Sequence, residues 1–133
     1  MCQISTAEDA ARRLRDGGVL AFPTETFYGL GCCADQAVAV ARVYQAKRRP
    51  VHMPLPLLAG SLDLLHPYVT LEQAPEALLT AFWPGPLTMI LKRDPVVPDR
   101  TTGGLDTVGV RCPDHPVTLA LIEASGVPIA APS

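Results

Sequence analysis

The sequence has few charged residues and no long hydrophobic run, and each absence excludes a class of protein. Charged side chains make up 18% of the 133 residues, below the usual share of about 25%. The 11 basic and 13 acidic residues give a formal net charge of −2, which argues against a broad basic face for nucleic acid. No apolar stretch reaches the ~18–20 residues that span a membrane, and the first residues lack the pattern of a signal peptide. We therefore expect a cytoplasmic protein with no membrane partner.

Several common motifs of nucleotide binding and catalysis are also missing. Neither G-x-x-x-x-G-K-[ST] nor G-x-G-x-x-G occurs, so a nucleotide site would need a different design. The four cysteines include no C-x-x-C pair, and we expect buried free thiols in a reducing compartment and no metal site. No carboxylate pair or nucleophile with its base is recognisable. A mechanism of positioning and charge stabilisation agrees best with these absences.

Proline is the residue type in excess. The chain has 14 prolines among 133 residues, about twice the average share of ~5%. They are scattered between apolar runs, which is typical of boundaries between elements. Without an internal repeat or linker, the length predicts one domain over residues 1–133. Because a buried strand pattern ends almost at the last residue, we expect this domain to be incomplete at its C-terminus.

Helical and extended patterns alternate along the chain. Helices are expected over residues 5–16, 35–46, 61–65, 75–82 and 116–124. Strands are expected over residues 19–22, 55–59, 87–91, 107–111 and 127–131. We expect Ser5 and Glu8 to form a capping box for the first helix and Asp35 to cap the second. Residues 92–104 are predicted to be a loop. The interleaving predicts an α/β domain with a largely buried sheet.

Polar residues follow three of the predicted strands. Thr24 follows the first strand, Arg111 ends the fourth and Ser133 follows the fifth. If these three strands are parallel neighbours, the side chains share one edge of the sheet, where open α/β sheets bind ligands. The alternative is that the threonine and serine only cap turns.

The densest positive charge is Lys47-Arg48-Arg49, which lies just before Pro50 where a helix is expected to end. These cations could clamp phosphates, with lysine as a point charge and arginine as a bidentate donor. The alternative is a solvated helix C-terminus, where cations are favoured by the helix dipole. His52 follows the cluster, and nearby cations disfavour its protonation. A neutral His52 could hydrogen-bond a small polar ligand.

Five ordered segments resemble motifs of the YrdC/Sua5 family of threonylcarbamoyl-AMP synthases. They are residues 22–31 (FPTETFYGLG), residues 47–55 (K-x-R-P followed by H-x-P-L), residues 83–88 (WPGPLT), residues 108–116 (V-G-V-R-x-P-x-H-P) and residues 128–133, which approach an S-x-N motif. The resemblance extends over residues 5–133. It implies an α/β fold with a twisted mixed sheet and flanking helices around a concave, positively charged cavity.

The resemblance also implies a reaction and its site. L-threonine, bicarbonate and ATP, with Mg²⁺ on the triphosphate, would give threonylcarbamoyl-adenylate and pyrophosphate for the t6A modification of adenosine 37 in tRNA. By motif position, the implied residues are Thr24, His52, Arg111 and Ala131 for L-threonine, and Lys47, Arg49, Thr107 and Ser133 for ATP, with Lys47 and Arg49 as the catalytic cations. Contact with tRNA or with the t6A-transfer machinery is a further expectation. Two other functions stay open: RNA binding without catalysis, and carbamoyl-adenylate formation on another acceptor.

Overall fold

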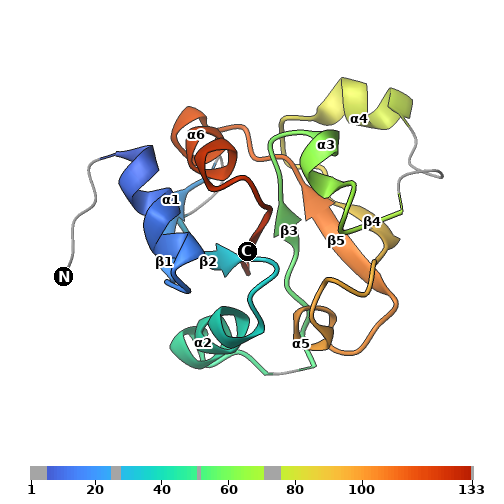
Figure 1. The fold of residues 1–133 in the computed structure, drawn as a ribbon. Coiled ribbons are helices and arrows are strands. Elements are labelled where there is room, and N and C mark those ends of the chain that lie inside the picture. Colours follow the sequence, from blue (N-terminus) through green and yellow to red (C-terminus); the bar gives the residue numbers. More distant parts are fainter. Residues whose placement is uncertain (1–5, 25–27, 51, 71–75, 133) are drawn as a thin grey trace.

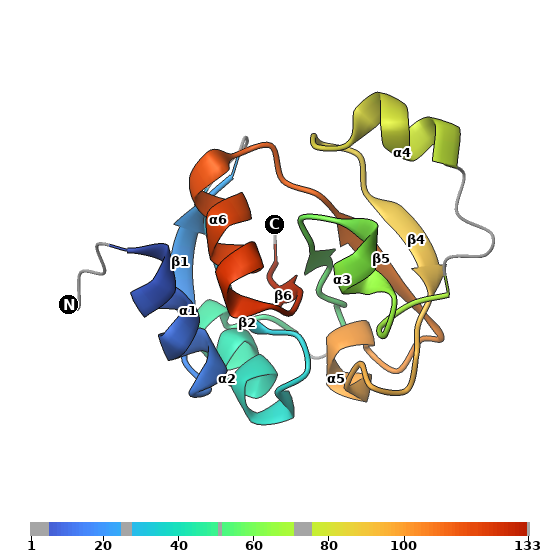
Figure 2. The ribbon, with the colours of Figure 1, turned by 45° about the horizontal axis from the view of Figure 1, so that its top comes forward.

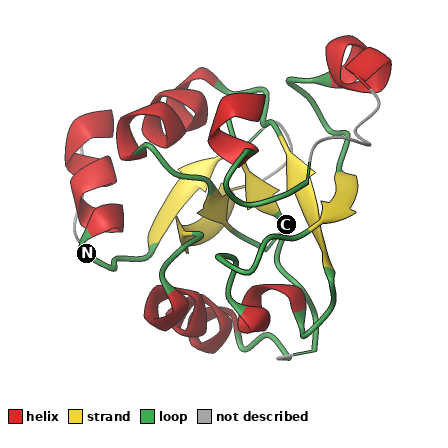
Figure 3. Ribbon diagram, turned by 45° about the vertical axis from the view of Figure 1, so that its right-hand side comes forward, coloured by secondary structure: helices red, strands yellow, loops and turns green. Residues whose placement is uncertain are grey.

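A computed structural model describes residues 6–24, 28–50, 52–70 and 76–132. These residues form one six-stranded mixed sheet with helices on both sides (Figure 1; Figure 3). In chain order the elements are α1 (Ala7–Arg15), β1 (Leu20–Pro23), β2 (Tyr28–Cys33), α2 (Ala37–Lys47), β3 (Leu57–Leu58), α3 (Leu62–Leu65), α4 (Glu76–Phe82), β4 (Met89–Lys92), α5 (Asp99–Thr102), β5 (Thr107–Arg111), α6 (Pro116–Ser125) and β6 (Ile129–Ala130). The strand order is β1-β2-β6-β3-β5-β4. The predicted twisted mixed sheet with flanking helices is confirmed.

The directions of the strands decide whether the polar residues that follow them share one edge of the sheet. β1 and β6 run the same way, since each is antiparallel to β2. β3 is antiparallel to β6 and parallel to β5, so β5 runs opposite to β1 and β6. The condition that β1, β5 and β6 are parallel neighbours ending at one edge is therefore not met. The sequence left the strand directions open because a buried strand has the same apolar pattern in either direction.

Alternate side chains separate the two faces of the sheet. Along β5, Val108 and Val110 are buried in one core, to which α2 contributes Val43. Because strand side chains alternate, Gly109 and Arg111 lie on the opposite face. A second core lies on that face and combines α1 and α6 with β1, β2, β3 and β6; among the described residues, none from β4 or β5 belongs to it. Figure 2 shows α1 and α6 at one end of the sheet and β4 at the other.

The caps of the first two helices differ from the prediction. Thr6 caps α1, and its side chain accepts a hydrogen bond from the Asp9 backbone N–H at 3.1 Å. The predicted cap at Ser5 lies outside the described residues. Gln36 is the N-cap of α2 and makes no side-chain capping bond, so the prediction of Asp35 is wrong. Both helices begin one or two residues later than the pattern suggested because apolar periodicity fixes a helix interior better than its ends.

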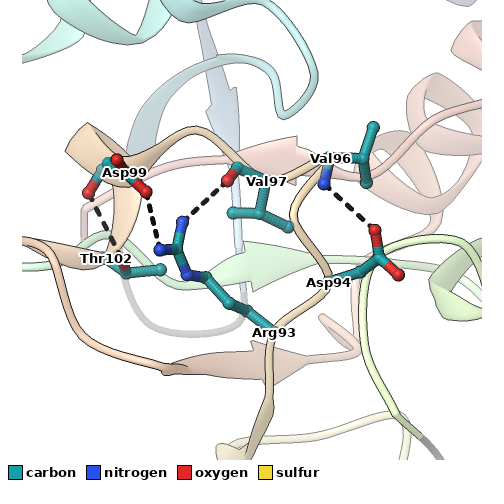
Figure 4. Close-up of polar contacts among 6 residues, drawn as sticks. All are labelled: Arg93, Asp94, Val96, Val97, Asp99 and Thr102. Atoms are coloured by element: carbon teal, nitrogen blue, oxygen red, sulfur yellow. Dashed lines mark hydrogen bonds and ion pairs between the residues drawn. The ribbon is translucent and has the colours of Figure 1, made fainter.

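Two elements were missed in the sequence. No strand was predicted over the residues of β2, and α5 lies inside the predicted loop 92–104. Figure 4 shows how α5 is held: the Arg93 guanidinium contacts the Asp99 carboxylate at 2.6 Å and donates to the Val97 carbonyl at 2.9 Å. A four-residue helix is too short for a periodic pattern, so tertiary contacts decide that it forms.

Candidate functional site

A cavity of about 270 Å³ lies over the part of the second face that α1 and α6 leave open. Its floor includes Gly109 of β5, which has no side chain, and Ile90 of β4, which is 66% exposed. The lining residues are Phe22, Thr24, Tyr28, Gly29, Arg49, Pro54, Leu55, Pro56, Leu58, Thr88, Ile90, Gly109, Arg111, Pro113, Ala131 and Pro132. The site is therefore on the face of the sheet rather than at an edge.

Four of the predicted site residues meet in this cavity. Thr24 follows β1 and Ala131 follows β6, so these two come from strands that run in the same direction. Arg111 ends β5 and Arg49 follows α2. The four share one hollow although β5 runs in the opposite direction, because the cavity spans the width of the face.

Helix α6 fixes the backbone next to Thr24. Its N-cap is His115, whose Nδ1 accepts a hydrogen bond from the Val117 N–H at 3.2 Å, and a proline occupies the first turn. One turn into this helix, the buried Thr118 hydroxyl donates to the carbonyl oxygen of Pro23. Since Pro23 precedes Thr24 directly, this hydrogen bond ties the cavity wall at the end of β1 to α6.

The Arg49 side chain is oriented by backbone carbonyls. Its Nε–H donates to the Met53 oxygen at 3.3 Å and its Nη2 donates to the Pro54 oxygen at 2.8 Å. A guanidinium carries five N–H donors, so three remain that bond to no other described residue. Because the side chain lines the cavity, these donors can serve a ligand there.

The turn over residues 83–88 supports the end of β5. The Gly85 N–H donates to the Cys112 carbonyl at 2.8 Å, and the Trp83 Nε1–H donates to the Leu87 carbonyl at 2.8 Å. A Cβ at Gly85 would lie 2.5 Å from the Phe82 oxygen, so the turn requires glycine. The WPGPLT segment therefore builds a wall beside Arg111, and its last residue, Thr88, lines the cavity.

The other predicted site residues lie elsewhere. Lys47 is the last residue of α2 and is exposed, as are His52 and Thr107. None of these three is among the residues that line the cavity. Ser133 lies outside the described residues. The structure thus brings together the predicted threonine-binding residues, apart from His52, and, among the described members of the predicted ATP-binding set, Arg49 alone.

Tyr28, Thr88 and Gly109 also line the cavity and were not predicted to do so. All three lie in the segments that carry the family resemblance. A glycine inside a strand often marks a close approach of another group, and that signal could have identified Gly109. A Cβ there would lie 3.1 Å from Thr88 Cγ2 and 3.6 Å from Ile90 Cδ1, so a side chain would narrow the floor.

The charged groups of the described lining are Arg49 and Arg111, and the lining contains no carboxylate. Within the described ranges no group of three or more His, Cys, Asp or Glu residues could hold a metal ion. Cys32 and Cys33 are buried and free, as predicted, and burial raises the pKa of these thiols to about 12 and about 11. They stay protonated near neutral pH and are poor nucleophiles. The two arginines of the cavity lining can therefore bind and orient anions.

No helix in the described part of the chain is long and apolar enough to cross a membrane.

One family profile and several known proteins match this sequence. The Sua5/YciO/YrdC profile, described as "Telomere recombination", matches residues 12–133. Threonylcarbamoyl-AMP synthase from Pyrococcus abyssi is 50% identical over 127 residues, which cover 93% of this chain and 37% of that protein. The protein of the same name from Vibrio cholerae is 39% identical over 138 residues, which cover 100% of this chain and 72% of that protein.

Solved structures with the same fold include a crystal structure of P. abyssi Sua5 complexed with L-threonine. It superposes with a TM-score of 0.90 at 48% identity, covering 96% of this chain and 38% of that one. The crystal structure of E. coli YciO gives a TM-score of 0.83 at 31% identity, covering 96% of this chain and 62% of that one. The present chain thus spans little more than a third of the P. abyssi protein's length.

Proposed function

The chain belongs to the Sua5/YciO/YrdC family, and on this premise we propose that it joins L-threonine, bicarbonate and ATP into threonylcarbamoyl-adenylate and pyrophosphate. The observation that carries the proposal is one cavity whose described lining holds two arginines and no carboxylate. An amino acid presents a carboxylate and a nucleotide presents phosphates, and guanidinium groups bind both with paired hydrogen bonds. A cavity with two such groups suits two anionic substrates that must meet.

In this proposal each of the two arginines binds a different substrate. Arg111 binds the threonine carboxylate, with Thr24 and the backbone at Ala131 against the rest of the amino acid. Arg49 binds the ATP phosphates with the donors that Met53 and Pro54 do not use. The support is that all these groups line the same hollow.

The size of the cavity suggests how much of the substrates it holds. Its volume of about 270 Å³ lies just below the ~300–1,000 Å³ of pockets for drug-sized ligands. We assign to it the amino acid and the reacting phosphate, so the rest of the nucleotide extends over exposed groups. Lys47 and Thr107 are the exposed candidates for these contacts, and Ser133 is retained from its motif alone. His52 is retained as a candidate contact of L-threonine, although it is exposed and is not among the lining residues.

The chemistry requires no nucleophile from the protein. The threonine amine attacks bicarbonate and forms a carbamate with loss of water, and a carbamate oxygen then attacks the α-phosphorus as pyrophosphate leaves. The protein aligns the two reactants and stabilises the developing negative charge. Mg²⁺ accompanies the triphosphate as its counter-ion. We place the reaction in the cytoplasm, with the product passed to tRNA for t6A synthesis.

Exchange of labelled pyrophosphate into ATP tests the proposal. The chain should catalyse exchange only when L-threonine and bicarbonate are both present. Arg49→Ala or Arg111→Ala should reduce it about 10- to 100-fold, because each removes hydrogen bonds between charged groups. Lys47→Ala should also reduce exchange, because Lys47 is the proposed contact of the nucleotide outside the cavity. Arg12→Ala is the matched control, since Arg12 is exposed on α1 and its nearest ion pair, with Asp9, is 3.7 Å long.

Three results would contradict the proposal in different ways. Exchange that does not depend on threonine would refute the substrate and favour another acceptor. Absence of exchange together with salt-sensitive RNA binding would favour the RNA-binding alternative. Equal loss in Arg12→Ala and Arg111→Ala would show that the cavity is not the site.

A further inference from the structure

The buried Tyr44 hydroxyl lies between two backbone carbonyls that belong to different segments. Tyr44 is on α2 and is 3% exposed. Its hydroxyl oxygen is 2.7 Å from the Met53 oxygen and 2.8 Å from the Arg100 oxygen. A phenol has one proton to donate, so it donates to one of these carbonyls at a time, and both lie within hydrogen-bonding distance of it.

One of these carbonyls also orients Arg49. The Met53 oxygen accepts from the Arg49 Nε–H at 3.3 Å, and the adjacent Pro54 oxygen accepts from Nη2 at 2.8 Å. A carbonyl oxygen has two lone pairs, so Met53 can accept from Tyr44 and from Arg49 together. The position of the Met53 oxygen therefore sets the direction in which the Arg49 guanidinium enters the cavity.

The other carbonyl belongs to α5, which is a fixed support. The Leu55 N–H donates to the Thr101 carbonyl of α5 at 2.7 Å. A Cβ at Gly103, just after α5, would lie 2.8 Å from the His52 oxygen, so the two backbones are in close contact. Arg93 anchors α5 to the end of β4 through Asp99 and Val97 (Figure 4). The segment 52–55 is thus hydrogen-bonded to α5 through Leu55 and to Tyr44 through Met53.

We propose that Tyr44 is a positioning residue that holds Arg49 in the orientation needed to bind the nucleotide phosphates, an inference that rests on the proposed function. Tyr44 itself does not line the cavity and acts only through the Met53 carbonyl. Without its hydroxyl, this carbonyl loses a donor, and the Arg49 side chain samples other orientations. Nucleotide binding weakens, whereas threonine binding at Arg111 and Thr24 is retained.

The test compares Tyr44→Phe with Tyr68→Phe in the full chain. Both replacements remove only a hydroxyl, and Tyr68 is buried in the same core, 6% exposed, away from the cavity. Calorimetric titration with ATP and with L-threonine measures the two affinities, and thermal unfolding checks the fold. We expect Tyr44→Phe to weaken ATP binding about five- to tenfold, the effect of one misplaced hydrogen-bonding group. Threonine affinity should change less than about twofold.

A second measurement needs no nucleotide. Nuclear magnetic resonance measures how fast the Arg49 Nε–H proton exchanges with solvent. This exchange should be faster in Tyr44→Phe than in the unmodified chain or in Tyr68→Phe. If Tyr44→Phe changes neither the affinity for ATP nor the rate at which the Arg49 Nε–H proton exchanges with solvent, the inference is overturned while the proposed function stands. Equal weakening in both variants would overturn it as well, because the effect would then be general destabilisation. An unmodified chain that binds no ATP would overturn the proposed function and this inference together.

Discussion

Replacing Gly31 with alanine should destabilise the fold and distort the cavity wall. A Cβ at this position of β2 would lie 2.7 Å from Ile129 Cγ2, 2.8 Å from the Ala130 oxygen and 2.9 Å from Ala131 Cβ. One of these atoms belongs to the backbone, so no change of rotamer can relieve the contact. The strand β6 must shift as a whole, although it is only two residues long and is paired on both sides.

The cost should reach the upper end of the range for overpacking, about 3 kcal/mol. For a domain of this size that corresponds to a melting temperature lower by about 10 °C. Since Ala131 lines the cavity, L-threonine should also bind more weakly. Urea unfolding measures the first effect and calorimetric titration measures the second.

Gly60→Ala is the control for this replacement. The nearest atom to a Cβ at Gly60 is Leu119 Cδ2 at 3.7 Å, which is an ordinary contact. We expect it to change the free energy of unfolding by less than about 0.5 kcal/mol. If Gly31→Ala lowers the free energy of unfolding no more than Gly60→Ala does, β2 and β6 do not approach each other as closely as described.

Three further predictions concern stability, and urea unfolding tests each of them. Arg48→Gly should stabilise the chain by about 0.5–1 kcal/mol, because Arg48 has the left-handed φ of 50° that favours glycine; destabilisation would contradict this. Thr118→Val should lower the free energy of unfolding by about 1–2 kcal/mol because it removes the hydrogen-bond donor to the Pro23 carbonyl. Thr118→Ser keeps a hydroxyl and should retain most of that stability. Burial raises the pKa of Cys32 to about 12 and of Cys33 to about 11 from the ordinary 9.0. Unfolded thiols therefore ionise first and stability should fall from pH 9 to 12; a flat profile would show that the thiols are not buried.

Most elements of the fold could be predicted because their side chains show a period. The strand at Thr107–Arg111 matches its alternating pattern, and the helix from Pro116 has its proline and its Gly126 in the expected places. β2 was missed because four of its six residues are glycine or cysteine, in the order Y-G-L-G-C-C, which has no clear alternation. Strand direction was not predictable, because it depends on pairing between residues distant in the sequence.

The candidate site shows the same division between local and long-range information. The sequence grouped Lys47, Arg48 and Arg49 as one basic cluster, and nothing in their spacing distinguishes them. The structure separates them through the backbone: Arg48 adopts the left-handed conformation at the end of α2, and the Arg49 N–H donates back to the Tyr44 carbonyl at 2.9 Å. This turn leaves Lys47 on the exposed helix and directs Arg49 toward the Met53 and Pro54 carbonyls at the cavity. Which cation of the cluster lines the cavity is thus decided by one backbone torsion and by carbonyls further along the chain. Spacing alone predicted the cluster but not this member, and only the resemblance to K-x-R-P singled out Lys47 and Arg49.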